Sequence, residues 1–174
     1  LYKFLREMEF NRLLSSAIST YGEPNFEDKK EDTKIIQTQE KISNKNYFLI
    51  KDIKAIDDWI KEAEEVGELA VDTETSSLDP HQADLIGISL SSKIGKACYI
   101  PLNHNSKENI NKDLVLKKLK PLLEDPSIKK IGQNIKFDFI VLLKQGIKLS
   151  SMEDTMLMSY VLDAGKNRHN MDTL

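Results

Sequence analysis

The spacing of apolar residues along this chain predicts strands that alternate with helices. An apolar run at 47–50 predicts a short strand. A helix should follow it, because apolar residues from Ile53 to Ala63 recur at helical spacing. Asp52 ahead of this run is typical of a helix N-cap, and Gly67 behind it is typical of a helix end.

Three further apolar runs, at 69–73, 85–90 and 96–102, are separated only by short turns. Strands that are joined this closely usually pair as antiparallel neighbours. An antiparallel sheet commonly buries one face and leaves the other open. We therefore expect a three-stranded meander with one buried face.

The remaining pattern adds three helices and a strand. It predicts a helix at 114–123 in spite of Pro121, a strand at 129–132, and helices at 134–145 and 152–164. These last two helices are expected to bury Ile135, Phe139, Leu142 and Leu143, and Met156, Leu157, Tyr160 and Val161, respectively. The predicted fold class is α/β, a mixed sheet with flanking helices.

The first 45 residues read differently from the rest of the chain. Residues 1–22 place apolar side chains at helical spacing, which predicts a helical tail. Residues 23–45 carry six acidic and five basic side chains with few apolar ones, so we expect a flexible charged linker. The packed domain should occupy residues 46–174.

Composition narrows the possible functions. The single cysteine, Cys98, excludes an internal disulfide framework and sits in an apolar run, so it is interpreted as a core residue. No apolar stretch is long enough to span a membrane, which predicts a cytoplasmic protein with no membrane partner. A net charge of -3 argues against a surface that coats DNA broadly. No phosphate-cradling glycine loop is present, so no small-molecule cofactor is expected.

The candidate chemistry lies in three acidic residues. Asp72 and Glu74 follow an apolar strand at a spacing of two, so their side chains should share one face. Asp138 lies at the border of the apolar stripe of the helix predicted at 134–145, where it can face a strand end. Converging carboxylates repel one another, and hard divalent cations such as Mg²⁺ or Mn²⁺ relieve that repulsion. Two such ions would suit phosphodiester hydrolysis.

Each of these residues also has an ordinary structural interpretation. An Asp-x-Glu pair arises easily by chance in a chain with 28 acidic residues. Asp138 reads equally as a solvated helix charge, Arg168 as a loop cation, and Leu78 as a turn residue tucked against the sheet. Residue pattern alone leaves these alternatives open.

Longer phrases of the sequence resemble the proofreading 3′→5′ exonuclease domain of bacterial family A DNA polymerase I, a member of the DEDD superfamily. The resemblance is carried by 72–79, by 131–138 with its Gly-Gln-Asn-Ile-Lys-Phe-Asp run, by 120–125, by 154–162 and by 168–174. The N-terminal helix resembles the tail of the preceding 5′-nuclease region. The resemblance implies a ribonuclease H-like fold and covers nearly the whole chain.

The resemblance also implies roles for individual residues. Asp72, Glu74 and Asp138 match metal-binding, catalytic carboxylates that hold two divalent cations, Mg²⁺ or Mn²⁺. The positions that match contacts to the single-stranded 3′ end of DNA are Thr75, Leu78, Gln133, Asn134, Arg168 and Met156, although Met156 reads equally well as a core residue.

The sequence departs from the family at one place. The family's third motif, Tyr-x-x-x-Asp, supplies a fourth carboxylate, and it does not occur in these 174 residues. We therefore expect a fragment, incomplete at its C-terminus, that is inactive or only weakly active alone and has the rest of a polymerase polypeptide as a partner. A ribonuclease D-like RNA exonuclease and a non-catalytic binding module are the alternatives.

Overall fold

The computed structural model describes residues 1–23, 46–105, 108–163 and 168–171. The chain divides into two compact units, residues 1–40 and 41–174, which we describe separately. Apart from Glu23, the linker predicted at 23–45 lies outside the described residues. Among the described residues, no helix is both long and apolar enough to cross a membrane.

The first unit contains two helices where a single helical tail was expected. Helix α1 spans Tyr2–Glu7 and helix α2 spans Asn11–Tyr21. The chain turns between them at Glu9, which has a positive φ of 56°. The Tyr2 hydroxyl donates to the Gly22 carbonyl at 2.9 Å, which ties the ends of the pair together.

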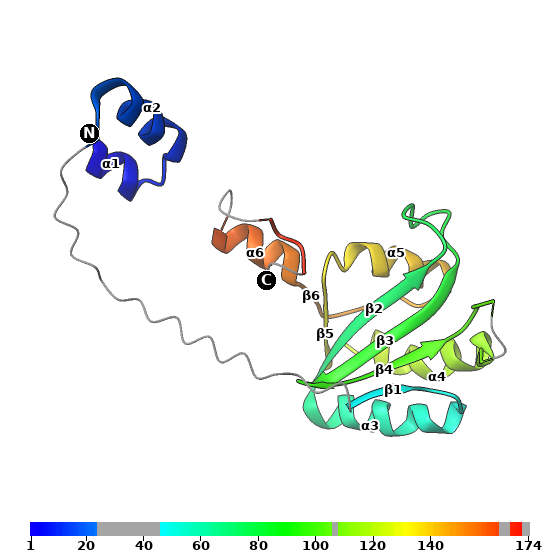
Figure 1. Cartoon of the computed structure of the whole chain (residues 1–174). Helices are drawn as coiled ribbons and strands as arrows, with labels where there is room; N and C mark the ends of the chain where they lie inside the picture. Colours follow the sequence, from blue (N-terminus) through cyan, green and yellow to red (C-terminus); the bar gives the residue numbers. More distant parts are fainter. Residues whose placement is uncertain (24–45, 106–107, 164–167, 172–174) are drawn as a thin grey trace. The chain divides into compact units, whose positions relative to one another are not determined.

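The second unit is built on a six-stranded mixed sheet (Figure 1). Its strands, in chain order, are β1 (Tyr47–Leu49), β2 (Glu68–Thr75), β3 (Leu85–Lys93), β4 (Lys96–Pro101), β5 (Lys129–Gly132) and β6 (Met152–Asp154). They lie side by side in the order β1-β4-β3-β2-β5-β6. The antiparallel meander β2-β3-β4 is confirmed, and the three outer pairings are parallel.

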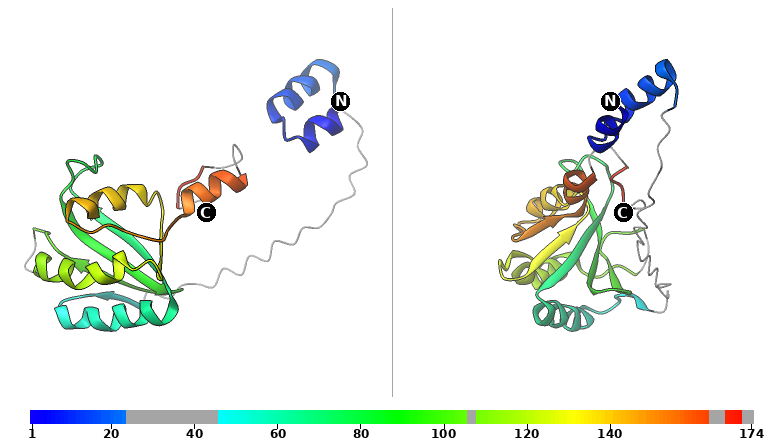
Figure 2. Two further views of the ribbon diagram at one scale, coloured as in Figure 1. Left: turned by 180° about the vertical axis from the view of Figure 1, so that it is seen from behind. Right: turned by 90° about the vertical axis from the view of Figure 1, so that its left-hand side faces the viewer.

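Helices cover one face of this sheet. They are α3 (Ile56–Val66), preceded by the 3₁₀ turn η2 (Ile53–Ala55), α4 (Lys112–Glu124) and α5 (Lys136–Lys144), and Figure 2 shows all three on the same side. Helix α4 continues through Pro121. The last described helix, α6 (Thr155–Asp163), follows β6.

The apolar core lies between these helices and the sheet. Alternate residues of β2, Leu69 and Val71, point into it, together with Ile88 and Leu90 of β3 and residues of α3 and α4. Cys98 is buried there as expected, and burial raises the pKa of its thiol to about 12.

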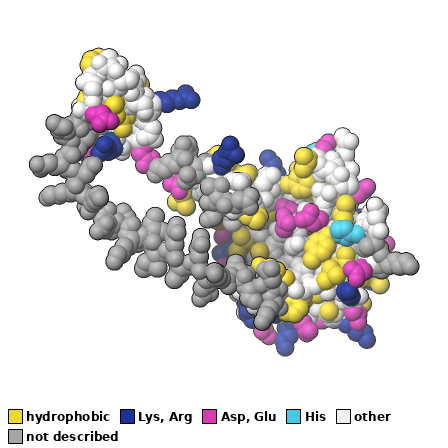
Figure 3. Space-filling model, viewed as in Figure 1, with side chains coloured by type: hydrophobic (Ala, Val, Ile, Leu, Met, Phe, Trp, Pro, Cys, Tyr) yellow, Lys and Arg dark blue, Asp and Glu magenta, His cyan; other side chains and the backbone are white. Residues whose placement is uncertain are grey.

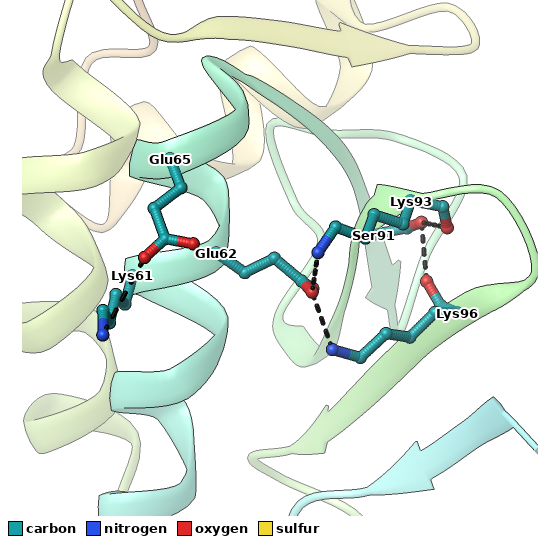
Figure 4. A network of polar contacts seen from close by, with 6 residues as sticks. All are labelled: Lys61, Glu62, Glu65, Ser91, Lys93 and Lys96. Atoms are coloured by element: carbon teal, nitrogen blue, oxygen red, sulfur yellow. Dashed lines mark hydrogen bonds and ion pairs between the residues drawn. The ribbon is translucent and has the colours of Figure 1, made fainter.

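The 3₁₀ turn η2, which leads directly into α3, begins at the predicted cap, and α3 ends at the predicted glycine. The Asp52 side chain accepts the Lys54 N–H at 2.9 Å, and Gly67 ends the helix in a left-handed conformation with φ 78°. From the same helix, Glu62 accepts ion pairs from Lys93 and Lys96, both at 2.8 Å (Figure 4). This nearly buried carboxylate fastens α3 to the turn between β3 and β4.

Two expectations about the C-terminal helices are wrong. The segment 152–154 is a strand rather than the first turn of a helix, because it pairs in parallel with β5, Lys130 opposite Met152 and Gly132 opposite Asp154. In α5, Val141 is buried and the predicted core residue Leu143 is 48% exposed.

The apolar residues of α6 are also more exposed than predicted. Among them, Leu157, Tyr160 and Val161 are exposed, and Met156 is half-buried. No described residue of α6 is fully buried.

Candidate active site

Strand β2 places Asp72 and Glu74 on the open face of the sheet, away from the helices. Burial alternates strictly along the strand: Val71 and Thr73 are buried, whereas Asp72 and Glu74 are exposed. The register places Asp72 opposite Ser89 and Glu74 opposite Gly87 of β3. The predicted convergence of the two carboxylates on one face is therefore present. Figure 3 shows acidic side chains gathered on this face and bordered by hydrophobic ones.

Asp138 reaches the same strand from the first turn of α5. Its side chain is only 3% exposed, and its Oδ1 accepts two hydrogen bonds from Thr73, one from the backbone N–H at 2.9 Å and one from the hydroxyl at 2.6 Å. The two residues are 65 positions apart in sequence. Asp138 thus faces into the domain, as its position on the helix predicted.

Burial and mutual repulsion both act on these carboxylates. Burial raises the pKa of Asp138 to about 6, the negative charge of Asp72 adds to this, and the hydrogen bonds from Thr73 offset part of it. Although Asp72 is exposed by its surface area, partial loss of hydration at its carboxyl group raises its pKa, and the charge of Glu74 raises it further. Two clustered acids that hold their protons more tightly than usual are the electrostatic signature of a site that favours a cation.

A cavity of about 470 Å³ joins the three carboxylates to other predicted site residues. Its walls come from the end of β2, the loop that follows β2, and the start of α5. Seven predicted site residues line it: Asp72, Glu74, Thr75, Leu78, Gln133, Asn134 and Asp138.

The loop that carries Leu78 is fixed by its own hydrogen bonds. Thr75 donates its hydroxyl to the Ser77 carbonyl at 3.0 Å, and Ser76 and Asp84 are joined at the two ends of the loop. The Lys144 ammonium donates to the Ala83 carbonyl at 2.8 Å, which attaches the loop to α5. Leu78 is 96% exposed on this braced loop, so the alternative interpretation, in which its side chain packs against the sheet, is wrong.

The turn between β5 and α5 is held by residues that the sequence did not single out. Asn134 has a positive φ of 55°, and its backbone N–H donates to Asp154 Oδ1 at 3.0 Å. The Gln133 amide donates to the His169 carbonyl at 2.7 Å and accepts from the Thr155 hydroxyl at 2.5 Å. Asp154 and Thr155 carried a sequence signal for this role, an N-cap residue type ahead of an apolar helical run.

Two predicted contact residues do not line the cavity. Arg168 is exposed, and it precedes the residue that Gln133 holds through its backbone carbonyl. Met156 is half-buried at the start of α6 and donates its backbone N–H to Asp154 Oδ1 at 2.9 Å. The roles predicted for these two side chains stay predictions.

The donor chemistry of the cavity fits a hard divalent cation, since its acidic ligands are carboxylates that repel one another. Both hydrogen bonds from Thr73 fall on one oxygen of Asp138, so Thr73 does not engage the other. As they stand, however, no three His, Cys, Asp or Glu side chains within the described part of the chain form a cluster that could hold a metal.

Comparison with known proteins identifies the family. The sequence model of a 3′–5′ exonuclease family matches residues 47–174, which is most of the chain. The chain belongs to this 3′–5′ exonuclease family. Over 135 residues it is 43% identical to DNA polymerase I of Pseudomonas aeruginosa, a match that covers 74% of this chain and 15% of the relative. The chain thus spans about 15% of the length of the relative that it matches.

Solved structures agree with this exonuclease fold. Brucella melitensis NrnC with bound Mg²⁺ has a TM-score of 0.53 and 26% sequence identity, over 74% of this chain and 58% of that one. Trypanosoma brucei RNase D in complex with GMP has a TM-score of 0.55 at 14% identity, over 67% of this chain and 36% of that one. The likeness to RNase D concerns the fold alone. The second unit of this chain therefore has the predicted ribonuclease H-like α/β fold.

Proposed function

We propose that this chain carries most of a proofreading 3′→5′ exonuclease domain, which removes terminal nucleotides from single-stranded 3′ ends of DNA with two divalent cations, Mg²⁺ or Mn²⁺. One observation carries the proposal: seven residues with predicted metal or strand contacts line a single cavity, although they lie in two stretches about sixty positions apart in sequence. The proposed parent is a DNA polymerase I, and the other parts of that polypeptide are the proposed protein partner.

The residues of the cavity suit these tasks. Asp72, Glu74 and Asp138 would hold the ions, which when bound activate water and stabilise the leaving oxygen of a phosphodiester. Leu78 offers an exposed apolar surface on a braced loop, which suits contact with the last base of a frayed strand. The amides of Gln133 and Asn134 can bond sugar or phosphate oxygens, and Arg168 can pair a phosphate.

An RNA or short oligonucleotide substrate is the second candidate. Its support is the likeness to NrnC, which has also been solved bound to pGG. The 43% identity with a DNA polymerase I favours DNA.

The test uses the 174-residue chain with 5′-labelled single strands of DNA and RNA of one sequence, in Mn²⁺. We expect slow shortening from the 3′ end, faster on DNA than on RNA, and lost in Asp138→Ala. Asp113→Ala, which removes an exposed carboxylate from the first turn of α4, is the matched control and should keep the digestion. Digestion that survives Asp138→Ala, or internal cleavage, would contradict the proposal. Binding without any cleavage would support a non-catalytic module instead.

A further inference from the structure

A tyrosine on the open face of the sheet lies beside Glu74. In the sheet, Gly87 of β3 pairs with Glu74 on one side and with Pro101 of β4 on the other. A Cβ atom added to Gly87 would lie 1.9 Å from the Tyr99 hydroxyl oxygen and 2.3 Å from the ring carbon that bears it. The phenol of Tyr99 therefore occupies the space above Gly87, which only a glycine at that position leaves open.

This position brings the Tyr99 hydroxyl close to the acidic site. Residues directly opposite on antiparallel strands have Cβ atoms about 5 Å apart and share one face. Glu74 is thus the immediate neighbour of the space that the phenol fills. Burial raises the pKa of Tyr99, and the negative charge of Glu74 raises it further, which agrees with this proximity.

The Tyr99 hydroxyl is hydrogen-bonded to a histidine. The Tyr99 hydroxyl lies 2.6 Å from His104 Nε2, and the two rings meet edge to face with centroids 5.6 Å apart. The His104 backbone is clamped by Asn109, whose side-chain oxygen accepts the His104 N–H at 2.8 Å and whose amide donates to the His104 carbonyl at 2.6 Å. The imidazole therefore presents Nε2 to Tyr99 from a backbone position that Asn109 holds at both its N–H and its carbonyl.

We propose that Tyr99 is a positioning residue of the acidic site, whose hydroxyl, backed by His104, orients the carboxylate of Glu74. When His104 Nε2 carries a hydrogen it donates to the phenol oxygen, and the phenolic hydrogen is left to donate to Glu74. Only one part of this role depends on the proposed function, namely that Glu74 is a metal ligand. Groups that orient a ligand in this way typically change metal affinity 10- to 100-fold when they are removed.

The proposed interaction between the Tyr99 hydroxyl and Glu74 can be tested without metal by a double-mutant cycle on urea unfolding in EDTA. Tyr99→Phe keeps the ring above Gly87 and removes only the hydroxyl. It should lower the urea midpoint more when Glu74 is present than in the Glu74→Ala background. Glu68→Ala is the matched control, because Glu68 is an exposed residue at the far end of the same strand, and its effect should add to that of Tyr99→Phe. Strict additivity of Tyr99→Phe with Glu74→Ala would overturn the proposal.

The consequence for the metal is tested by Mn²⁺ titration followed by calorimetry. Tyr99→Phe should weaken Mn²⁺ binding by about tenfold, and Gly87→Ala should do the same because its methyl group displaces the phenol. Tyr47→Phe removes a phenol hydroxyl from β1, on an exposed residue that does not line the acidic cavity, and should leave the affinity unchanged. Wild-type affinity in Tyr99→Phe would refute a positioning role. If the unaltered chain binds no Mn²⁺, the proposed metal site fails, whereas the unfolding cycle still decides whether Tyr99 orients Glu74.

Discussion

At the scale of single residues, Asp138 combines three conditions that together make its ionised form unfavourable in the folded chain. It is a carboxylate, it is almost fully buried, and it lies near the charge of Asp72. The two hydrogen bonds from Thr73 compensate for only part of the lost hydration, since the pKa still rises from 3.8 to about 6. Without a cation, the ionised form of Asp138 therefore destabilises the folded chain near neutral pH.

This imbalance predicts a pH dependence of stability. Because the folded state holds the Asp138 proton more tightly than the unfolded state, the metal-free chain should become more stable as the pH falls from about 7 to about 5. The gap between 3.8 and about 6 corresponds to on the order of 3 kcal/mol for the full transition. Urea unfolding in EDTA at several pH values measures it.

The Asp138→Asn variant is the control for this pH dependence. It should be more stable than the unaltered chain at neutral pH and should lose most of the gain on acidification. Below about pH 4.5 the unaltered chain should become less stable again as the pH falls. The carboxylates of Glu124 and Asp125 have lowered pKa values and lose their stabilising contacts when they are protonated. A stability that falls steadily from pH 7 to 5 would contradict the assignment.

Asp72 gives a second prediction about metal and stability. Removing it should nearly abolish Mn²⁺ binding, because Asp72 shares the cavity with Glu74 and Asp138 and interacts electrostatically with both. Without metal, Asp72→Ala should be as stable as the unaltered chain or more so, since the charge that acts on Asp138 and that Glu74 repels is gone. Calorimetric Mn²⁺ titration and thermal unfolding in EDTA measure the two effects. An unchanged Mn²⁺ affinity would remove Asp72 from the site.

At the scale of secondary-structure elements, Asp154 is the residue that joins β6, α5 and α6. Its carboxylate accepts backbone N–H groups from Asn134 and Ile135 before α5, at 3.0 and 3.1 Å, and from Met156 and Leu157 in α6, at 2.9 and 3.3 Å. One side chain thus satisfies the N-terminal donors of two helices. It also sets where α5 begins, and therefore where Asp138 lies.

Loss of this carboxylate should cost more than loss of an ordinary helix cap. Asp154→Ala should lower the free energy of unfolding by about 2 kcal/mol or more, the upper range for a single cap, because both helix starts lose acceptors. It should also weaken Mn²⁺ binding through the displacement of α5. Asp113→Ala, at the first turn of α4, should cost only a few tenths of a kcal/mol. Equal losses in the two variants would show that Asp154 is an ordinary cap.

The same elements show what the sequence could and could not predict. The meander, α3 with its cap and end, and the face of Asp72 and Glu74 follow from local periodicity, and all three were predicted correctly. The strand β6 was missed because its three residues owe their conformation to pairing with β5, which is a long-range contact. The buried Lys130 follows from no pattern either, since it is satisfied only by the carbonyls of Asp125 and Ile128 at 2.5 and 2.6 Å.

The acidic site also has one part that local sequence pattern predicts and another that depends on long-range contacts. Period-two alternation is enough to pair Asp72 with Glu74, but no local rule connects either with Asp138, which is over sixty residues away. The helix position of Asp138 made that connection possible, and the resemblance to an exonuclease family singled it out. In the structure, the hydrogen bonds between Thr73 and Asp138 connect the two segments. Tyr99 and His104 had no signal, because the space above Gly87 exists only once the strands are paired.

At the scale of the whole molecule, the arrangement of the carboxylates predicts weak activity in Mg²⁺. Hydrolysis of a phosphodiester by this chemistry needs two ions and an oriented water, and Mg²⁺ demands near-ideal octahedral geometry. Within the described residues, the three acidic side chains share a cavity without forming a ready metal cluster. We therefore expect the 174-residue chain to digest single-stranded DNA in Mg²⁺ at least about 100-fold more slowly than a chain whose metal site is fully assembled, because mispositioned groups cost about that factor.

The comparison is made under one condition, with 5′-labelled DNA and equal enzyme concentrations, and it includes a chimera. In the chimera, the segment of P. aeruginosa DNA polymerase I that follows the matched region is joined after Leu174. If the slow digestion by the 174-residue chain reflects incomplete assembly of the metal site, the chimera should digest DNA rapidly from the 3′ end. Asp138→Ala in the chimera should abolish that digestion. Rapid digestion by the unaltered chain in Mg²⁺, dependent on Asp138, would show instead that binding of metal and strand is enough to bring Asp72, Glu74 and Asp138 into a complete catalytic site.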